Sequence, residues 1–130
     1  YTENGSEKAL EQLGSDLDRR EIKTIQRHIS TLLGAGSLAD AARYAQEGHN
    51  RFPGDSELAR LVERLTLLSV ERFEEAMRQA EAAEGARDWA RAAQSMESAL
   101  KLFPESTLAE ERHRLYEQRA QQSQRKRLRL

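Results

Sequence analysis

One twenty-residue pattern occurs twice in this sequence, at residues 34–53 and again at 85–104, without a gap in either copy. Each copy starts with Gly-Ala, carries small alanines and ends with Phe-Pro. A recurring pattern is typical of proteins built from stacked copies of one supersecondary unit. The sequence therefore predicts a helical repeat, in which a turn opens each copy and a proline closes it. The identical pairs are Gly34/Gly85, Ala35/Ala86, Ala39/Ala90, Ala41/Ala92, Ala42/Ala93, Phe52/Phe103 and Pro53/Pro104.

The composition favours an all-α fold. Ala, Leu, Glu, Gln and Arg favour helices, and only two prolines and seven glycines interrupt the 130 residues. No apolar run approaches the roughly 20 residues that span a bilayer, which predicts a soluble domain of undetermined compartment, with the cytoplasm slightly favoured over the periplasm. Cysteine is absent, so thiol catalysis and thiolate metal sites are excluded. The start at Tyr1 and the basic end indicate a segment of a larger protein.

The amino-terminal part of the chain is expected to be weakly structured. Residues 1–14 are polar and acidic, and Gly14 is expected to end any helix there. This segment is interpreted as an appendage or linker. The helical domain is predicted over residues 15–120 with about five or six helices, and its first helix, at about 17–33, carries isoleucines and leucines at helical spacing.

The third helix is expected to be unusually long, because no Gly or Pro interrupts the chain between about residues 55 and 84. At 1.5 Å per residue it would be roughly 45 Å long. Its apolar residues keep to one helical stripe, while Leu67 and Val70 lie on another face. A break between Thr66 and Val70, giving two ordinary helices, is the alternative.

The last helix is expected to begin at Thr107. Its packing face is predicted to be the stripe of Leu108, Leu115 and Tyr116. After this stripe the helical spacing of apolar residues ends, and a run of Gln, Arg and Lys follows. Residues 121–130 are therefore predicted to be a basic, disordered tail.

With these helices the chain resembles the tetratricopeptide repeat family, in which stacked helix pairs carry small residues and a closing proline in their second helix. The resemblance covers roughly residues 20–120 and is strong in the second helices and degenerate in the first ones. It implies an α-α superhelix and a role in binding other proteins. The residues that carry it are Trp89, Ala92, Met96, Ala99 and Pro104 in the second copy and Leu38, Ala41, Ala45, Gly48 and Pro53 in the first.

The spacing of the two copies departs from that family. Pro53 and Pro104 lie 104 − 53 = 51 residues apart, whereas tandem repeats of the family recur every 34 residues. The surplus of 51 − 34 = 17 residues corresponds to nearly five helical turns. We therefore expect one long central helix to serve both repeats. Its amino-terminal half would pack on the first hairpin, and its other half would be the first helix of the second repeat.

The sequence contains no pattern typical of a catalytic or metal site. His28, His49 and His113 are far apart, and none has a partner at metal-ligand spacing. The acidic residues of the long helix alternate with Arg, as on a solvated helix face. The common glycine-rich nucleotide motifs and the nucleophile motif do not occur. The sequence therefore predicts no enzyme and no cofactor.

The leading interpretation is a scaffold or adaptor region that binds a protein partner. Helix pairs of this kind form a groove in which a peptide or helix can dock through apolar contacts and Arg-carboxylate bonds. Lys23 and Arg27 lie one turn apart on the first expected helix, and Arg60 and Arg64 lie one turn apart on the third. All four are predicted to line this groove.

Two other contacts are open alternatives. Leu67 and Val70 would form a patch for a homodimer or a partner if the centre of the long helix is uncovered, and their burial against residues 1–14 is the competing interpretation. The basic tail could contact phosphate backbones or an anionic membrane surface. The net charge of −1 argues against nucleic acid, and membrane contact would come only through the tail or the parent protein. The tail residues concerned are Arg125, Lys126, Arg127 and Arg129.

Overall fold

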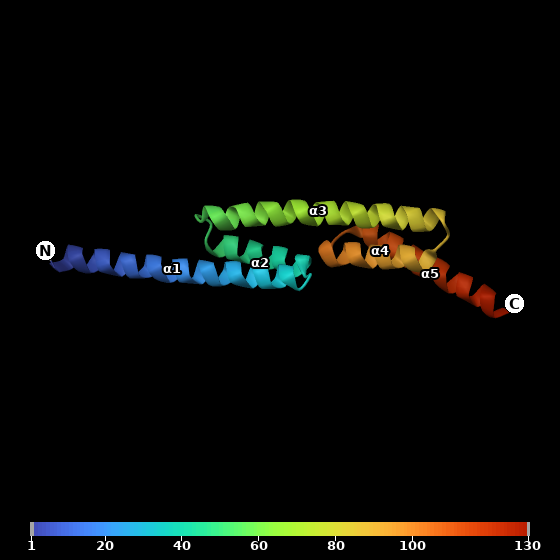
Figure 1. Cartoon of the computed structure of the whole chain (residues 1–130), viewed down its shortest axis with the longest axis horizontal. Coiled ribbons are helices and arrows are strands. Elements are labelled where there is room, and N and C mark those ends of the chain that lie inside the picture. The colour runs from blue at the N-terminus through green and yellow to red at the C-terminus, as the bar shows by residue number, and fades with distance from the viewer. Residues whose placement is uncertain (1, 130) are drawn as a thin grey trace. The chain divides into compact units, whose positions relative to one another are not determined.

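A computed structural model describes residues 2–129, and the side chains of residues 5–129. All regular structure in this range is α-helical, which confirms the all-α fold class. The helices are labelled in Figure 1. They are α1 (Thr2–Gly34), α2 (Leu38–Arg51), α3 (Ser56–Gly85), α4 (Trp89–Leu102) and α5 (Thr107–Arg129).

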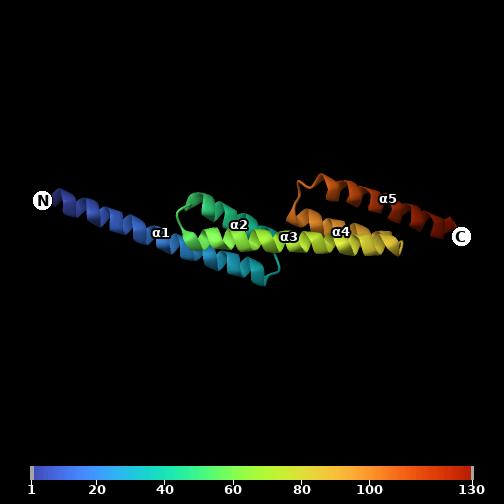
Figure 2. The ribbon, with the colours of Figure 1, turned by 90° about the horizontal axis from the view of Figure 1, so that it is seen from above.

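The helices form two compact units, which divide between Thr66 and Leu67. Unit 1 contains α1, α2 and the first part of α3, and unit 2 contains the rest of α3 with α4 and α5. Within unit 1 α2 folds back along α1, and within unit 2 α5 folds back along α4 (Figures 1 and 2). Helix α3 continues without a break through both units. The expectation of one long shared helix is confirmed, and the alternative break between Thr66 and Val70 is wrong.

The helix boundaries repeat with the same interval as the sequence pattern. Helices α2 and α4 begin at Leu38 and Trp89, and 89 − 38 = 51. The same interval separates the ends of α1 and α3, at residues 34 and 85, and the starts of α3 and α5, at residues 56 and 107. The repeated unit is therefore a helix end, a turn, a 14-residue helix, a second turn and the start of the next long helix.

The first turn of each repeat has the same hydrogen bonds. In unit 1 the Ser37 amide donates to the Leu32 carbonyl at 2.9 Å, and in unit 2 the Asp88 amide donates to the Ala83 carbonyl at 2.8 Å. In a helix end closed by this bond, the residue just before the donor takes a left-handed conformation, where glycine is favoured. Gly36 has that conformation in unit 1, with φ of +77°, but Arg87 has it in unit 2, with φ of +56°.

The second turn caps the long helices by side-chain oxygens. The Leu58 amide donates to the Asp55 carboxylate at 2.9 Å, and the Ala109 amide donates to the Ser106 hydroxyl at 3.2 Å. Each bond satisfies an amide that has no partner within its own helix. The repeat is thus preserved in backbone and capping geometry even where the residue types differ.

The core of unit 1 forms where its three helices meet at Gly48 of α2. A Cβ atom at this position would lie 3.0 Å from Ile25 of α1 and 3.9 Å from Leu58 of α3. The absence of a side chain allows these helices to approach each other closely. The buried apolar side chains of this unit include Ile25, Ile29, Leu38, Ala41, Ala45, Leu58 and Leu65.

The core of unit 2 is made mainly of alanines and includes the fully buried Met96. Tyr116 of α5 is 1% exposed, and its hydroxyl donates to the Glu84 carboxylate of α3 at 2.8 Å. Burial, reinforced by this bond, raises the pKa of Tyr116 to about 12. The residues of this cluster are Ala76, Ala80, Ala83, Ala92, Ala93, Met96, Ala99, Ala109 and Tyr116.

Helix α1 differs from its prediction at the amino terminus. It continues through Gly14 to Thr2 instead of beginning near residue 17. A glycine inside a helix costs only about 1 kcal/mol relative to alanine, so it weakens the helix without ending it. Every side chain of residues 5–20 is exposed, including Leu17 at the start of the predicted helix. Residues 2–14 are thus continuous with α1.

Helix α5 differs from its prediction in two respects. Residues 121–129 are helical rather than disordered, since Gln, Arg and Lys are good helix formers. Of the predicted stripe, Tyr116 is buried as expected, but Leu108 and Leu115 are about half exposed, and Ala109 is buried instead. The small side chain of Ala109 permits close packing on α4, and the Tyr116 hydroxyl finds a hydrogen-bond partner.

Candidate interaction site beside Trp89

The structure brings together only two of the four residues predicted to line a groove. Lys23 and Arg27 line a shallow hollow of about 490 Å³ on α1, together with Gln26, Ser30 and Thr31. Arg60 and Arg64 are exposed on α3 and do not line it. The residues follow one another on a single helix, so this surface is no groove between helices. Its role in partner binding stays a prediction.

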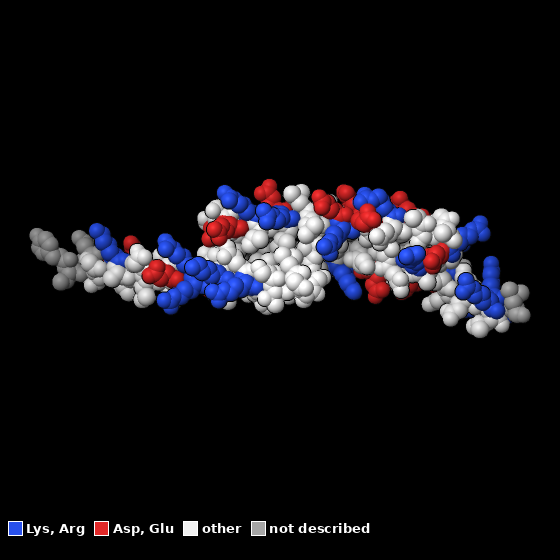
Figure 3. All heavy atoms as spheres, in the orientation of Figure 1, with Lys and Arg blue, Asp and Glu red and all other residues white. Residues whose placement is uncertain are grey.

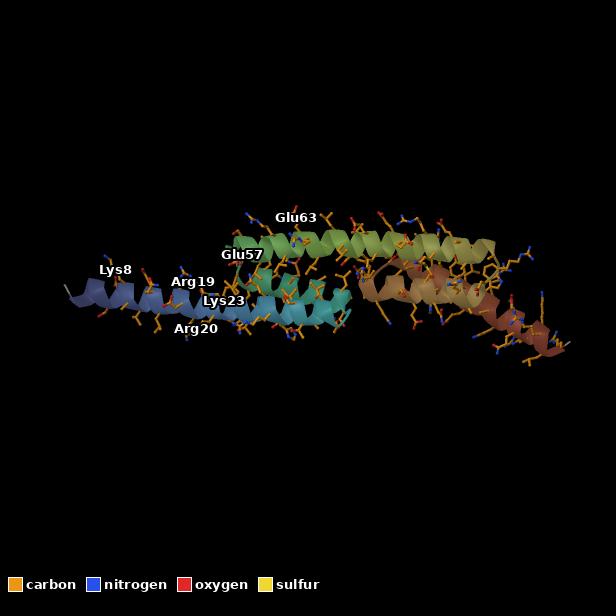
Figure 4. All side chains as sticks on the ribbon, viewed as in Figure 1. Lys8, Arg19, Arg20, Lys23, Glu57 and Glu63 are labelled. Carbon is orange, nitrogen blue, oxygen red and sulfur yellow. The ribbon has the colours of Figure 1, made fainter. Side chains whose placement is uncertain are left out.

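An acidic side chain also lies next to that surface. The Gln26 amide donates to the Glu57 carboxylate of α3 at 2.8 Å. Figure 4 shows Glu57 on the side of α3 that faces α1, whereas Glu63 points away. Basic and acidic side chains both occur along the part of α1 that precedes this surface (Figure 3). The region is therefore a mixed-charge surface rather than a basic groove.

The apolar pair on the long helix is uncovered. Leu67 is 62% exposed and Val70 is 39% exposed. They are three residues apart in α3, so their side chains lie on the same face. Neither side chain belongs to the core of unit 2.

One of the four basic residues near the carboxyl terminus, Arg127, lines a hollow in the described part of unit 2. Arg125, Lys126, Arg127 and Arg129 are exposed on α5. Arg127 lines a hollow of about 590 Å³ in unit 2, and the other three do not. This hollow, which we call the Trp89 hollow, is the larger of the two sites and the one with an aromatic wall.

Two segments of unit 2 build the Trp89 hollow. One is the turn between α3 and α4 with the first residues of α4, and the other is one face of α5. Residues 120, 123, 124 and 127 share that face because a helix brings residues three, four and seven apart to one side. The lining residues are Ala86, Arg87, Asp88, Trp89 and Ala90 from the first segment and Ala120, Ser123, Gln124 and Arg127 from the second.

Trp89 is half-buried, so part of its indole ring forms the wall of the hollow. The ring of Tyr116 lies 6.2 Å from it, and the guanidinium of Arg119 lies 5.7 Å from its centroid. A cation over an aromatic face is attracted by the ring. Contacts from both neighbours hold the indole in place, which makes it a preformed wall.

The repeat explains why unit 1 has no copy of this arrangement of side chains. Leu38 occupies the position of Trp89 and Gly36 that of Arg87, since 38 + 51 = 89 and 36 + 51 = 87. On the long helices, Gln124 and Arg127 correspond to Phe73 and Ala76, which pack in the core of unit 2. At these two equivalent positions α5 therefore carries polar side chains, whereas α3 carries apolar ones.

Sequence reasoning found this site only in part. The sequence marks Arg127 as a basic tail residue and Trp89 as a residue of the repeat pattern, but it does not show that they lie close together. A signal was present, because Arg87 stands where the first copy has a glycine. Hydrophobic periodicity does not show which face of the last helix lies next to the turn that carries Trp89. The site could therefore not be predicted from periodicity.

Comparisons with protein-family models, with curated proteins and with solved structures found no match for this chain. Among the residues that the structure describes, no group of three or more His, Asp or Glu side chains is placed to hold a metal ion. None of the described helices is long and apolar enough to cross a membrane.

Proposed function

We propose that this chain is a non-enzymatic protein-interaction module, and that unit 2 holds a segment of a partner protein in the Trp89 hollow. The observation that carries the proposal is a preformed hollow with a half-buried Trp and several Arg residues around it. Trp and Arg are the residue types that most often dominate the binding energy of protein interfaces.

In this proposal the helix pairs act as a tetratricopeptide-like scaffold or adaptor region of a larger protein. The support is the repetition of helix ends, turns and caps at a constant interval, together with the small residues buried in both second helices. Stacked helix pairs present surfaces to which extended segments or helices can bind. The 51-residue interval, longer than the 34 residues of that family, distinguishes this chain.

The test uses Trp89→Leu, which introduces the residue that occupies the equivalent position in unit 1. We expect peptides selected on the native chain from a random display library to lose at least about 30-fold in affinity for this variant, as at an interface hot spot. Isothermal titration calorimetry measures the affinity, and circular dichroism checks folding. Leu115→Ala, which truncates an exposed residue of the same unit outside the hollow, should bind the peptides unchanged. Equal binding to Trp89→Leu and the native chain would rule out the proposal.

Self-association is the second candidate function, favoured by the exposure of Leu67 and Val70. An apolar pair on the surface of a helix can be covered by a second copy. We expect sedimentation equilibrium to show a concentration-dependent dimer that Leu67→Lys abolishes. Leu115→Lys places the same charge at another exposed leucine and should leave the dimer intact. A monomer at every concentration would eliminate this candidate.

A further inference from the structure

We infer that the Trp89 hollow selects an acidic peptide segment. In this arrangement Arg87 and Arg127 pair with carboxylates of the segment from the two walls of the hollow, and Trp89 contacts an apolar side chain between them. The inference rests on the proposed function, because it names the chemistry of the segment that the same site would hold.

The charges around the hollow are the first argument. Within residues 5–129, ion pairs engage Arg43, Arg51, Arg78, Arg112 and Arg114, but not Arg87, Arg119 or Arg127. The one acidic lining residue, Asp88, accepts a hydrogen bond from the Arg91 amide at 3.3 Å. The hollow therefore has an excess of positive charge and Arg donors free for a ligand. Arg binds carboxylates by paired, charge-assisted hydrogen bonds.

The backbone of Arg87 is the second argument. Its φ of +56° is a conformation that favours glycine, and unit 1 has Gly36 at the equivalent position. A non-glycine residue there costs stability. Arg87 nevertheless lines the hollow. A strained residue at the wall of a hollow is consistent with a contribution to binding that offsets its cost.

The lining favours a peptide over nucleic acid or an anionic surface. Ala86, Ala90 and Ala120 provide small apolar surfaces beside Trp89, which fit an aliphatic side chain. The backbone amides of a peptide can donate to the Asp88 carboxylate, which the repeating phosphates of a nucleic-acid backbone cannot do. Nucleic-acid binding depends on many basic residues along a surface, but Arg125, Lys126 and Arg129 lie outside the hollow.

The test compares two arginines in the same stretch of α5. The probe is a fluorescein-labelled synthetic peptide of alternating Glu and Leu, and its matched control is the same peptide with Gln in place of Glu. We expect Arg127→Gln to weaken binding of the Glu peptide about tenfold or more. Arg125→Gln removes the same charge two residues away and should change the affinity less than twofold. Fluorescence anisotropy measures both.

Arg87→Gly provides an independent second variant. We expect this variant to raise the melting temperature of unit 2, because glycine fits the turn. We also expect it to lower the affinity for the Glu peptide several-fold. A variant that binds the Glu peptide as tightly as the native chain would contradict the role of Arg87. Loss of stability in this variant would contradict the claim that the arginine is retained at a cost.

Several results would overturn the inference. Equal affinity for the Gln and Glu peptides would do so, as would equal weakening by Arg125→Gln and Arg127→Gln, which would indicate diffuse attraction to the tail. Tighter binding of a single-stranded oligonucleotide or an anionic phosphatidylserine vesicle than of the Glu peptide would reassign the site. Library peptides that are neutral or basic yet depend on Trp89 would refute the acidic preference and leave the proposed function standing, whereas independence from Trp89 would refute both.

Discussion

Replacing Gly48 with leucine is expected to unfold unit 1 or to destabilise it by about 3 kcal/mol, at the upper end of the usual cost of overpacking a core. A Cβ atom alone would lie 3.0 Å from the Cγ2 atom of Ile25. Ile25 is 6% exposed and Leu58 is fully buried, so neither can move aside into solvent. The larger side chain would force α2 away from α1 and α3 within this unit.

Two variants isolate the steric cause. Gly48→Ala should be close to neutral, because the helix propensity gained, about 1 kcal/mol, opposes the tight contact with Ile25. Gly14→Leu should stabilise α1 by roughly 0.5–1 kcal/mol, since no atom lies within 4 Å of a Cβ built at that position. Urea denaturation followed by far-ultraviolet circular dichroism measures all three. A Gly48→Leu variant as stable as the native chain would show that α2 does not pack in this way.

Replacing Tyr116 with alanine is expected to cost unit 2 about 4 kcal/mol, as for other large buried side chains truncated to alanine. Tyr116 is 1% exposed and belongs to the core cluster that joins α3, α4 and α5. Its ring also contacts Trp89. The fluorescence of Trp89, the only tryptophan in the sequence, reports unfolding of this unit directly.

Tyr116→Phe separates packing from hydrogen bonding. It keeps the ring and removes the bond to Glu84, so it should cost only about 1 kcal/mol at neutral pH. Alanine and phenylalanine variants of equal stability would contradict a packing role for the ring.

The raised pKa of Tyr116 also predicts a pH dependence. The folded protein keeps the phenol protonated up to about pH 12, while the unfolded chain releases the proton near its usual value of 10. Between these values the unfolded state binds fewer protons, so stability falls as the pH rises, by on the order of 2 kcal/mol in total. Tyr116→Phe should lack this component. Urea denaturation of the native chain and the variant at pH 9 and pH 11.5 measures it, and identical pH profiles would refute it.

Much of the architecture followed from local patterns. The two copies of the repeat placed the turns, the short helices and the uninterrupted third helix, because glycine, proline and capping residues act over a few neighbours. The predicted extents of the first and last helices were wrong, because they too depended on a few neighbouring residues. Gly14 predicts a helix stop and the polar run after residue 120 predicts disorder, but the neighbouring residues favour helix, and both segments are helical.

The candidate site was less predictable. Lys23, Arg27, Arg60 and Arg64 share a helical spacing, but spacing does not determine which helices lie opposite each other. The sequence distinguishes Arg127 only by its charge. Its relation to Arg87 and Trp89 arises because α5 packs on α4 through Ala109 and Tyr116 rather than through Leu108 and Leu115.

The sequence by itself thus determined that the chain is an all-α repeat with one long helix common to both copies. Hydrophobic periodicity and the glycine, proline and capping residues that end helices act on nearby residues of the chain. Only the tertiary structure decided which face of α5 is buried. That choice depends on side-chain volumes and on a hydrogen-bond partner for the Tyr116 hydroxyl, both supplied by distant residues. The same rotation of α5 turns Gln124 and Arg127 toward the Trp89 turn and so creates the hollow.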